Sequence, residues 1–168
     1  MAAKALQLIS AFILLGFFNL AIAYNAPATI HVSGKVVCQE CSKSYSDWVR
    51  GDRPLKGCKV SLTCMDYRGR VVLYDSDVTD DLGGFSIVAD KYRRNGKKLD
   101  EKLCEVRLIS SPDPTCNVLT NYGFGKSGVR LKEPVSVYRD TVKYLVGPFY
   151  GTSPMCEMPV AYQQGTGY

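Results

Sequence analysis

Seven cysteines constrain this chain of 168 residues more than any other feature, and all of them lie after residue 37. Two of them are separated by two residues in "KVVCQEC" (35–41). Zinc sites, thiol redox centres and structural disulfides all use this spacing. The compartment separates these alternatives, because disulfides persist in oxidising environments and are rare in the cytosol.

The N-terminus predicts that the chain is secreted. A short basic start ends at Lys4, an apolar run containing "AFILLGFF" (11–18) follows, and "AIA" ends at Ala23. This pattern is typical of a signal peptide cleaved before Tyr24, and the apolar run is shorter than the roughly 20 residues of a membrane span. We therefore expect an extracellular protein with no membrane contact after cleavage. The expected divisions are a signal peptide at 1–23, a linker at 24–29, one domain at 30–156 and a disordered tail at 157–168.

An oxidising compartment favours disulfides over metal or redox chemistry at the "CQEC" motif. A zinc site would need a second close pair of cysteines or a Cys/His pair, and His31 is the only histidine. A thioredoxin-type redox pair opens a helix, but the following "SKSYSDWVRGDRP" (42–54) has no helical periodicity. We expect both cysteines to be half-cystines, with no metal and no cofactor.

Alternating side chains predict an all-β domain. Apolar residues alternate with polar ones in "IHVSGKVVC" (30–38), and "CKVSLTC" (58–64) and "CEVRLIS" (104–110) repeat the pattern. The best helical candidate is the short "KKLDEKL" (97–103), which can equally be a loop. The closely spaced short strands predict a single antiparallel β-sandwich or barrel of about seven strands, stapled by disulfides. The remaining expected strands are 71–75, 84–90, 128–131, 134–138 and 142–147.

An odd number of cysteines leaves one without a partner inside the chain. Cys58 and Cys64 fall on the same face of the expected strand 58–64. We expect Cys58 to be a free thiol that packs in the core as a small apolar residue, where alanine would serve equally. The alternative is a disulfide between two chains through Cys58.

A resemblance to the pollen Ole e I allergen and extensin family of plant secreted proteins rests on five segments in family order: "HVSGKVVCQEC", "GCKVSLTC", "VTDDLGGFSI", "CEVRLISSPDPTC" and "VGPFYGTSPMC". They cover residues 31–156. From the residues alone, six cysteines allow 15 pairings. The resemblance implies three disulfides, and only the last has independent support, from two inward-facing strand positions: Cys38–Cys116, Cys41–Cys156 and Cys64–Cys104.

The resemblance implies a non-enzymatic protein of the plant cell wall or extracellular space that acts by binding or as a structural component. The expected partners are wall polysaccharides such as pectin, or wall glycoproteins, and no nucleic acid. The alternative is a secreted signalling or regulatory ligand for a receptor or enzyme. An enzyme is the third hypothesis, but His31 lies on a strand without a nucleophile elbow, and nothing singles out a carboxylate pair. The oligomeric state stays open.

One candidate binding site is the basic stretch "KYRRNGKK" (91–98). Without Lys4, the chain has 20 Lys and Arg against 16 Asp and Glu, a net charge of +4 that permits an acidic polymer as partner. The alternative is a solvated hairpin loop whose charges deter aggregation. The residues of this candidate polyanion site are Lys91, Arg93, Arg94, Lys97 and Lys98.

Three weaker motifs have simpler explanations. "RGD" (50–52) resembles an adhesion tripeptide but fits a polar loop. Asp75, Asp77, Asp80 and Asp81 lack the spacing of a calcium loop and favour a turn. The chain has eleven tyrosines. We expect those on the surface to be available for stacking on sugar rings or for oxidative cross-linking. Others, such as Tyr144, should be core residues.

Overall fold

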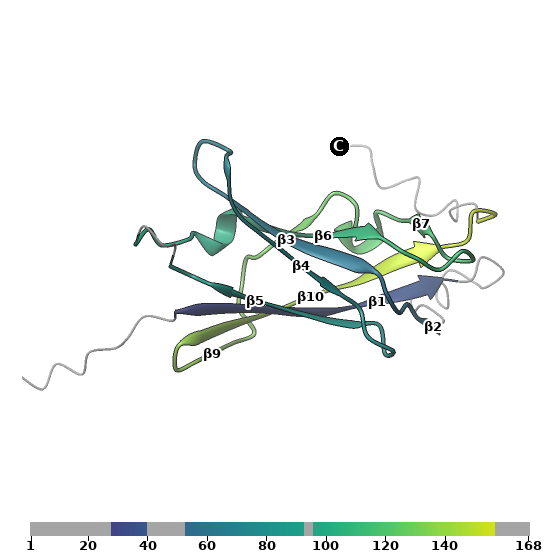
Figure 1. The fold of residues 1–168 in the computed structure, drawn as a ribbon, viewed down its shortest axis with the longest axis horizontal. Coiled ribbons are helices and arrows are strands. Elements are labelled where there is room, and N and C mark those ends of the chain that lie inside the picture. Colours follow the sequence, from purple (N-terminus) through teal and green to yellow (C-terminus); the bar gives the residue numbers. More distant parts are fainter. Residues whose placement is uncertain (1–27, 40–52, 93–95, 157–168) are drawn as a thin grey trace, which may run out of the picture.

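The alternation of apolar and polar residues produces two β-sheets that pack face to face (Figure 1). The computed structural model describes residues 28–39, 53–92 and 96–156. Six strands form the larger sheet: β1 (Thr29–Gln39), β2 (Arg53–Pro54), β5 (Gly84–Asp90), β7 (Val118–Leu119), β9 (Ser136–Tyr138) and β10 (Thr141–Thr152). Four strands form the smaller sheet: β3 (Lys59–Met65), β4 (Val71–Val78), β6 (Cys104–Ser110) and β8 (Val129–Arg130).

The all-β class and the two-sheet arrangement are confirmed, but one pairing differs from the antiparallel expectation. β1 and β10, the two longest strands, run parallel, with Thr29 opposite Thr141 and Gln39 opposite Thr152. The other strand pairs are antiparallel. A parallel pair needs a long crossover connection. Here the chain between the two strands supplies it, and side-chain alternation alone carries no information on strand direction.

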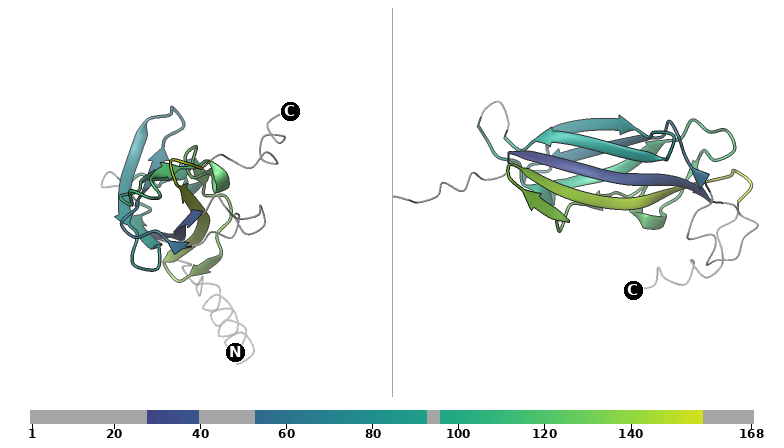
Figure 2. Two further views of the ribbon diagram at one scale, coloured as in Figure 1. Left: turned by 90° about the vertical axis from the view of Figure 1, so that its right-hand side faces the viewer. Right: turned by 90° about the horizontal axis from the view of Figure 1, so that it is seen from below.

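The core lies between the two sheets, whose strands surround it when viewed end-on (Figure 2). The expected inward positions of β1 and β3 are buried, and Tyr144 is a core residue as predicted. Burial raises the pKa of the Tyr144 hydroxyl. Burying one large apolar side chain contributes about 1.5–3 kcal/mol, so this core dominates the folding free energy. Its largest fully buried side chains include Phe149, Ile30, Leu55, Leu62, Ile87 and Leu131.

Gly34 of β1 lies too close to β10 and to Phe85 of β5 to carry a side chain. A Cβ atom at this position would lie 2.3 Å from the Val146 carbonyl oxygen and 2.6 Å from the Phe85 ring. The ladder between β1 and β10 shifts its register between Gly34 and Val36. A side chain at position 34 would therefore push the central strand pair away from the core.

Two disulfides join distant parts of the chain. Cys38 is bonded to Cys116, and Cys64 of β3 is bonded to Cys104, directly opposite on β6. These are two of the pairs that the family resemblance implies. Because Cys38 is bonded to Cys116, the "CQEC" motif is not a local disulfide. Cys156 is also disulfide-bonded, and its expected partner, Cys41, lies outside the described residues.

Cys58 is a free, buried thiol, as predicted. Burial raises the pKa of this thiol, so it stays protonated and unreactive in the folded protein. Its backbone N–H donates a hydrogen bond to Thr79 Oγ1 at 2.8 Å, and the Thr79 hydroxyl donates to the Leu55 carbonyl at 2.6 Å. The start of β3 is thereby held to two neighbouring segments.

Several expectations fall on residues that the structure does not describe: the signal peptide, most of the linker, the "RGD" motif and the tail 157–168. The helical candidate at 97–103 is only a 3-10 turn, η1 (Glu101–Leu103). Over the described ranges, the two helical segments, η1 and η2 (Tyr122–Phe124), are each three residues long, and neither could cross a membrane.

Removing the β3–β6 disulfide should destabilise the protein far more than removing the free thiol. The free energy of unfolding of the Cys64→Ala/Cys104→Ala variant should be roughly 2–5 kcal/mol lower than that of wild type, because the unfolded chain regains the freedom of a long loop. Cys58→Ala should lose about 1 kcal/mol, since it removes one buried atom and leaves the backbone hydrogen bond in place. Denaturant unfolding measures both losses of stability. Equal losses would contradict a stabilising role for the Cys64–Cys104 disulfide.

Arg53 anchors β2 to the loop that follows β6. Its Nη1 donates to Asp113 Oδ2 at 2.6 Å and its Nη2 donates to Thr115 Oγ1 at 2.7 Å. Asp113 also accepts the hydroxyl and backbone N–H of Thr115. Together these hydrogen bonds hold the pKa of Asp113 well below its usual range, and the bond from Arg53 contributes most.

This lowered pKa predicts a specific acid sensitivity. A carboxylate whose pKa is lower in the folded state stabilises the protein above its unfolded pKa of about 3.9 and loses that contribution as the pH falls through the folded pKa. The stability of wild type should therefore fall more steeply below about pH 4 than that of Asp113→Asn. Thermal unfolding at stepped pH measures this difference, and parallel curves for the two proteins would contradict the role of Asp113.

Candidate functional site

A pocket of about 380 Å³ lies at the end of the sandwich where β3 ends and β6 begins. One wall is the turn between β3 and β4, formed by residues 65–67, 70 and 72. The other wall is the segment that leads into η1, formed by residues 97–100 and 103. Figure 1 shows both segments at the same end of the two sheets. The pocket thus includes Lys97 and Lys98 of the basic stretch that the sequence singled out.

Asp66 organises the first wall. Its Oδ1 accepts the backbone N–H groups of Arg68 and Arg70 at 2.9 and 3.0 Å, and its Oδ2 lies 2.7 Å from Arg70 Nη2. The hydrogen bonds from Arg70, through its backbone and its side chain, lower the pKa of Asp66. The Tyr67 side chain is 82% exposed, and the Arg68 guanidinium carbon lies 5.4 Å from its ring centroid. The turn therefore presents an aromatic ring beside two cations.

Leu99 anchors the second wall. Its side chain is buried, and its backbone N–H donates to the Lys91 carbonyl at 2.7 Å. Asp100 Oδ1 accepts the backbone N–H of Lys102 at 3.1 Å and so begins η1. Lys97 and Lys98 precede this anchor, line the pocket and are exposed. The cations on this wall therefore extend from a segment that is fixed to the core.

The prediction that Lys91 belongs to an exposed polyanion site is wrong. Its side chain is 7% exposed and forms an ion pair with Glu101. Lys91 continues the inward alternation of Phe85, Ile87 and Ala89, and this parity in the sequence could have revealed its burial. The Lys91–Glu101 pair closes the base of the loop between β5 and η1, whereas Arg93 and Arg94 lie outside the described residues.

Sequence reasoning missed Tyr67 and Arg70 as site residues. Their segment, "DYRGR" (66–70), has the composition of a turn, and Gly69 takes the positive φ of +74° that the turn requires. The available signal was an aromatic residue followed by two arginines in a turn. Only the structure places this turn opposite Lys97 and Lys98.

The acidic residues 75–81 form turn and edge contacts. Asp80 Oδ1 accepts the backbone N–H groups of Leu82 and Gly84 at 2.9 and 2.8 Å, which is the turn that the sequence predicted. Asp77 Oδ2 accepts the backbone N–H of Ser86 at 2.7 Å. Within residues 28–39, 53–92 and 96–156, no group of three His, Cys, Asp or Glu side chains is arranged to hold a metal ion.

His31 and Ser86 meet on the outer face of the larger sheet. His31 Nε2 and Ser86 Oγ are 2.7 Å apart. Asp77 contacts the Ser86 main chain rather than the imidazole. A Ser–His–Asp relay requires the carboxylate to orient the histidine ring, so this arrangement lacks the geometry of such a relay.

Comparison with known proteins identifies relatives of this chain among plant proteins. No protein-family model matches the chain. A pistil-specific extensin-like protein from Nicotiana tabacum is 31% identical over 129 residues, which cover 73% of this chain and 29% of that protein. An Olee1-like protein from Betula pendula is 33% identical over 119 residues, covering 70% of this chain and 63% of that protein.

A solved structure shows the same fold. The crystal structure of the major plantain pollen allergen Pla l 1 superposes with a TM-score of 0.52 and 21% sequence identity, covering 79% of this chain and 99% of that chain. The molecule is thus a disulfide-stapled, two-sheet β domain of the pollen-allergen type. By sequence, the chain is similar to the Ole e 1-like and extensin-like proteins of plants. It spans 29% of the tobacco relative and 63% of the birch relative.

The burial of Lys91 predicts opposite outcomes for two lysines of the same stretch. Lys91→Met should destabilise the fold by about 3 kcal/mol, because Glu101 would keep a poorly solvated charge without its partner. Lys98→Met should change stability by no more than about 0.5 kcal/mol, since this side chain is exposed. Urea unfolding of the two variants is the measurement, and equally small losses would show that the Lys91–Glu101 pair has no structural role.

Proposed function

We propose that this protein is a secreted, non-enzymatic component of the plant extracellular space that binds acidic wall polysaccharide in the pocket between the β3–β4 turn and η1. One observation carries the proposal: the pocket combines the exposed ring of Tyr67 with the cations Arg70, Lys97 and Lys98. The signal-peptide pattern and the extensin-like relatives support the extracellular location.

The chemistry of the pocket fits a polymer of sugar acids. An aromatic face packs against the apolar face of a sugar ring, and ammonium or guanidinium groups form charge-assisted hydrogen bonds with carboxylates. A volume of about 380 Å³ lies within the usual range for small-molecule sites, so the pocket would hold a short stretch of a longer chain.

The two carboxylates of the pocket have structural tasks. Asp66 binds the backbone of its own turn and the Arg70 side chain, and Asp100 caps η1. Lys97 and Lys98 are exposed on the wall opposite Asp66. Because all of these charges border solvent, their attraction for a polyanion is screened over about 8–10 Å at physiological ionic strength.

The test compares two variants that each remove two exposed lysines. Lys97→Gln/Lys98→Gln alters the pocket, whereas Lys59→Gln/Lys126→Gln alters lysines remote from it, at the start of β3 and beside the end of β6. Binding to de-esterified pectin should weaken roughly two- to thirtyfold in the pocket variant, since each exposed ion pair contributes about 0.2–1 kcal/mol. The control variant should retain nearly all of its binding at the same net charge.

Salt and a neutral glycan complete the test. Wild-type binding to de-esterified pectin should decrease steeply with added salt, and methyl-esterified pectin should bind weakly, because its carboxylates are masked. Equal losses in both lysine variants would reduce the interaction to general charge attraction and overturn the pocket assignment. No pectin binding, with saturable binding to a membrane fraction instead, would favour the signalling alternative.

A further inference from the structure

The dipeptide Tyr-Arg occurs three times in the chain, at 67–68, 92–93 and 138–139. The first is in the β3–β4 turn, the second follows the end of β5, and the third spans the end of β9 and the turn into β10. All three tyrosines are exposed, by 82%, 43% and 64% in chain order. Figure 1 shows the β3–β4 turn, the end of β5 and the β9–β10 turn at the same end of the sandwich.

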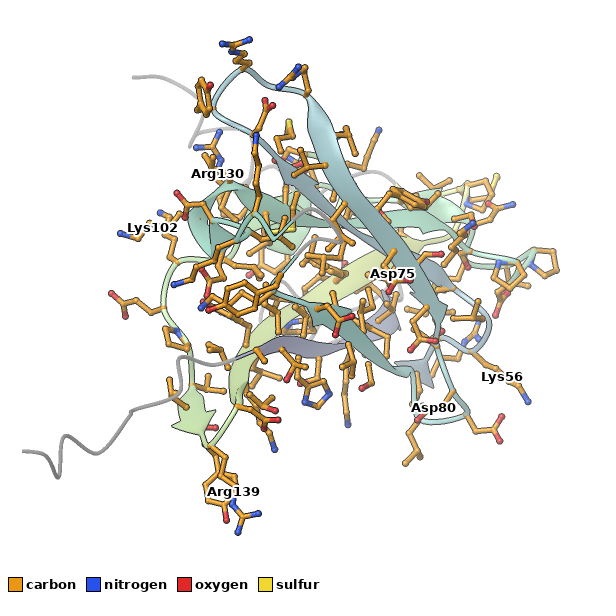
Figure 3. The ribbon with its side chains drawn as sticks, turned by 60° about the vertical axis from the view of Figure 1, so that its left-hand side comes forward. Lys56, Asp75, Asp80, Lys102, Arg130 and Arg139 are labelled. Atoms are coloured by element: carbon orange, nitrogen blue, oxygen red, sulfur yellow. A yellow bond between two sulfur atoms is a disulfide. The ribbon has the colours of Figure 1, made fainter. Side chains whose placement is uncertain are left out.

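The β9–β10 turn repeats the design of the pocket turn on the other sheet. The Arg139 guanidinium carbon lies 5.2 Å from the centroid of the Tyr138 ring, close to the 5.4 Å of Arg68 and Tyr67. In Figure 3, Arg139 and Lys102 lie on one side of the molecule, and Lys56 and Asp80 lie on the other. The end face thus carries an aromatic-cation pair on each sheet.

The β9–β10 turn is held firmly in place. The Asp140 carbonyl accepts the backbone N–H groups of Ala28 and Thr29 at 2.6 and 2.8 Å. Tyr138 pairs with Thr141 in the strand ladder. The Tyr138–Arg139 pair therefore projects from a rigid corner, which lowers the entropy that binding would cost.

Arg139 occupies a backbone conformation that suits glycine or asparagine. Its φ angle is +51°, in the left-handed region, where a Cβ atom is unfavourable. Two-residue hairpin turns prefer Gly, Asn or Asp at such positions. Strained conformations of this kind concentrate at functional sites, so an arginine here points to a use for its side chain.

We propose that the Tyr138–Arg139 corner is a second contact for the same acidic polysaccharide, so that one polymer binds at two separated points on the end face. This inference rests on the proposed function of the pocket. The carboxylates of Asp90, Asp100, Glu133 and Asp140 also border this end and are exposed, so each single contact is weak. Tight binding therefore requires a chain long enough to reach both points.

Chain length is the distinguishing property of a two-point site. When a polymer is held in the pocket, its contact with the corner becomes intramolecular and takes place at a high effective concentration. A short oligomer fills the pocket alone and gains nothing from the corner. The ratio of polymer affinity to oligomer affinity is therefore a direct measure of the second contact.

The experiment measures the affinity of immobilised protein for a short oligogalacturonate and for long polygalacturonate. Arg139→Gly should lower polymer affinity at least threefold and leave oligomer affinity unchanged. The same substitution should keep or raise the melting temperature, since glycine relaxes the positive φ. Lys126→Gln removes one exposed cation away from this end and should change neither affinity.

The outcomes separate this inference from the proposed function. If wild type binds neither ligand, both ideas fail. If wild type binds both ligands and Arg139→Gly keeps the full preference for polymer, the corner is no contact and the pocket stands alone. If Arg139→Gly weakens oligomer and polymer equally, the turn acts on the pocket itself and the two-point arrangement is wrong.

Discussion

The parallel pairing of β1 with β10 supports the rest of the molecule, because every other strand of the larger sheet pairs with one of these two. β5 and β2 attach to β1, and β9 and β7 attach to β10. Both strands begin at the end of the sandwich that bears the pocket. The hydrogen bonds from Ala28 and Thr29 to Asp140 lock that end, so the pairing that builds the sheet also fixes the β9–β10 turn.

The candidate site depends on a few polar contacts set into this frame. The Lys91–Glu101 pair closes the loop after β5, Leu99 ties that loop to the core, and Asp66 shapes the opposite turn. None of these contacts needs to touch a ligand. They hold exposed lysines, arginines and tyrosines on rigid supports, which allows weak surface charges to act together on a polymer rather than separately.

Side-chain alternation predicted the strands well, since β5 and β6 have the bounds expected from sequence and the inward faces of β1 and β3 are buried. The same alternation predicted that Cys58 is buried, and the family resemblance left it without a partner. Alternation could not predict the direction of β10 relative to β1, because parallel and antiparallel strands alternate alike. The disulfide partners came from family resemblance. The pocket escaped prediction because only tertiary packing brings Tyr67 and Lys98 to the same pocket. Lys91 was assigned to the surface because of its charge, despite its inward position on the strand.

The most direct test of the central claim maps where an acidic glycan touches the protein. Backbone amide NMR signals can be followed while oligogalacturonate is added to the isotope-labelled, disulfide-bonded protein. Our account predicts saturable shifts at the amides of Arg68, Arg70 and Leu99, whose hydrogen bonds shape the two walls of the pocket. Signals from the start of β3 and the end of β6 should stay unchanged. Shifts confined to that opposite end, or no shifts at saturating ligand, would contradict the account.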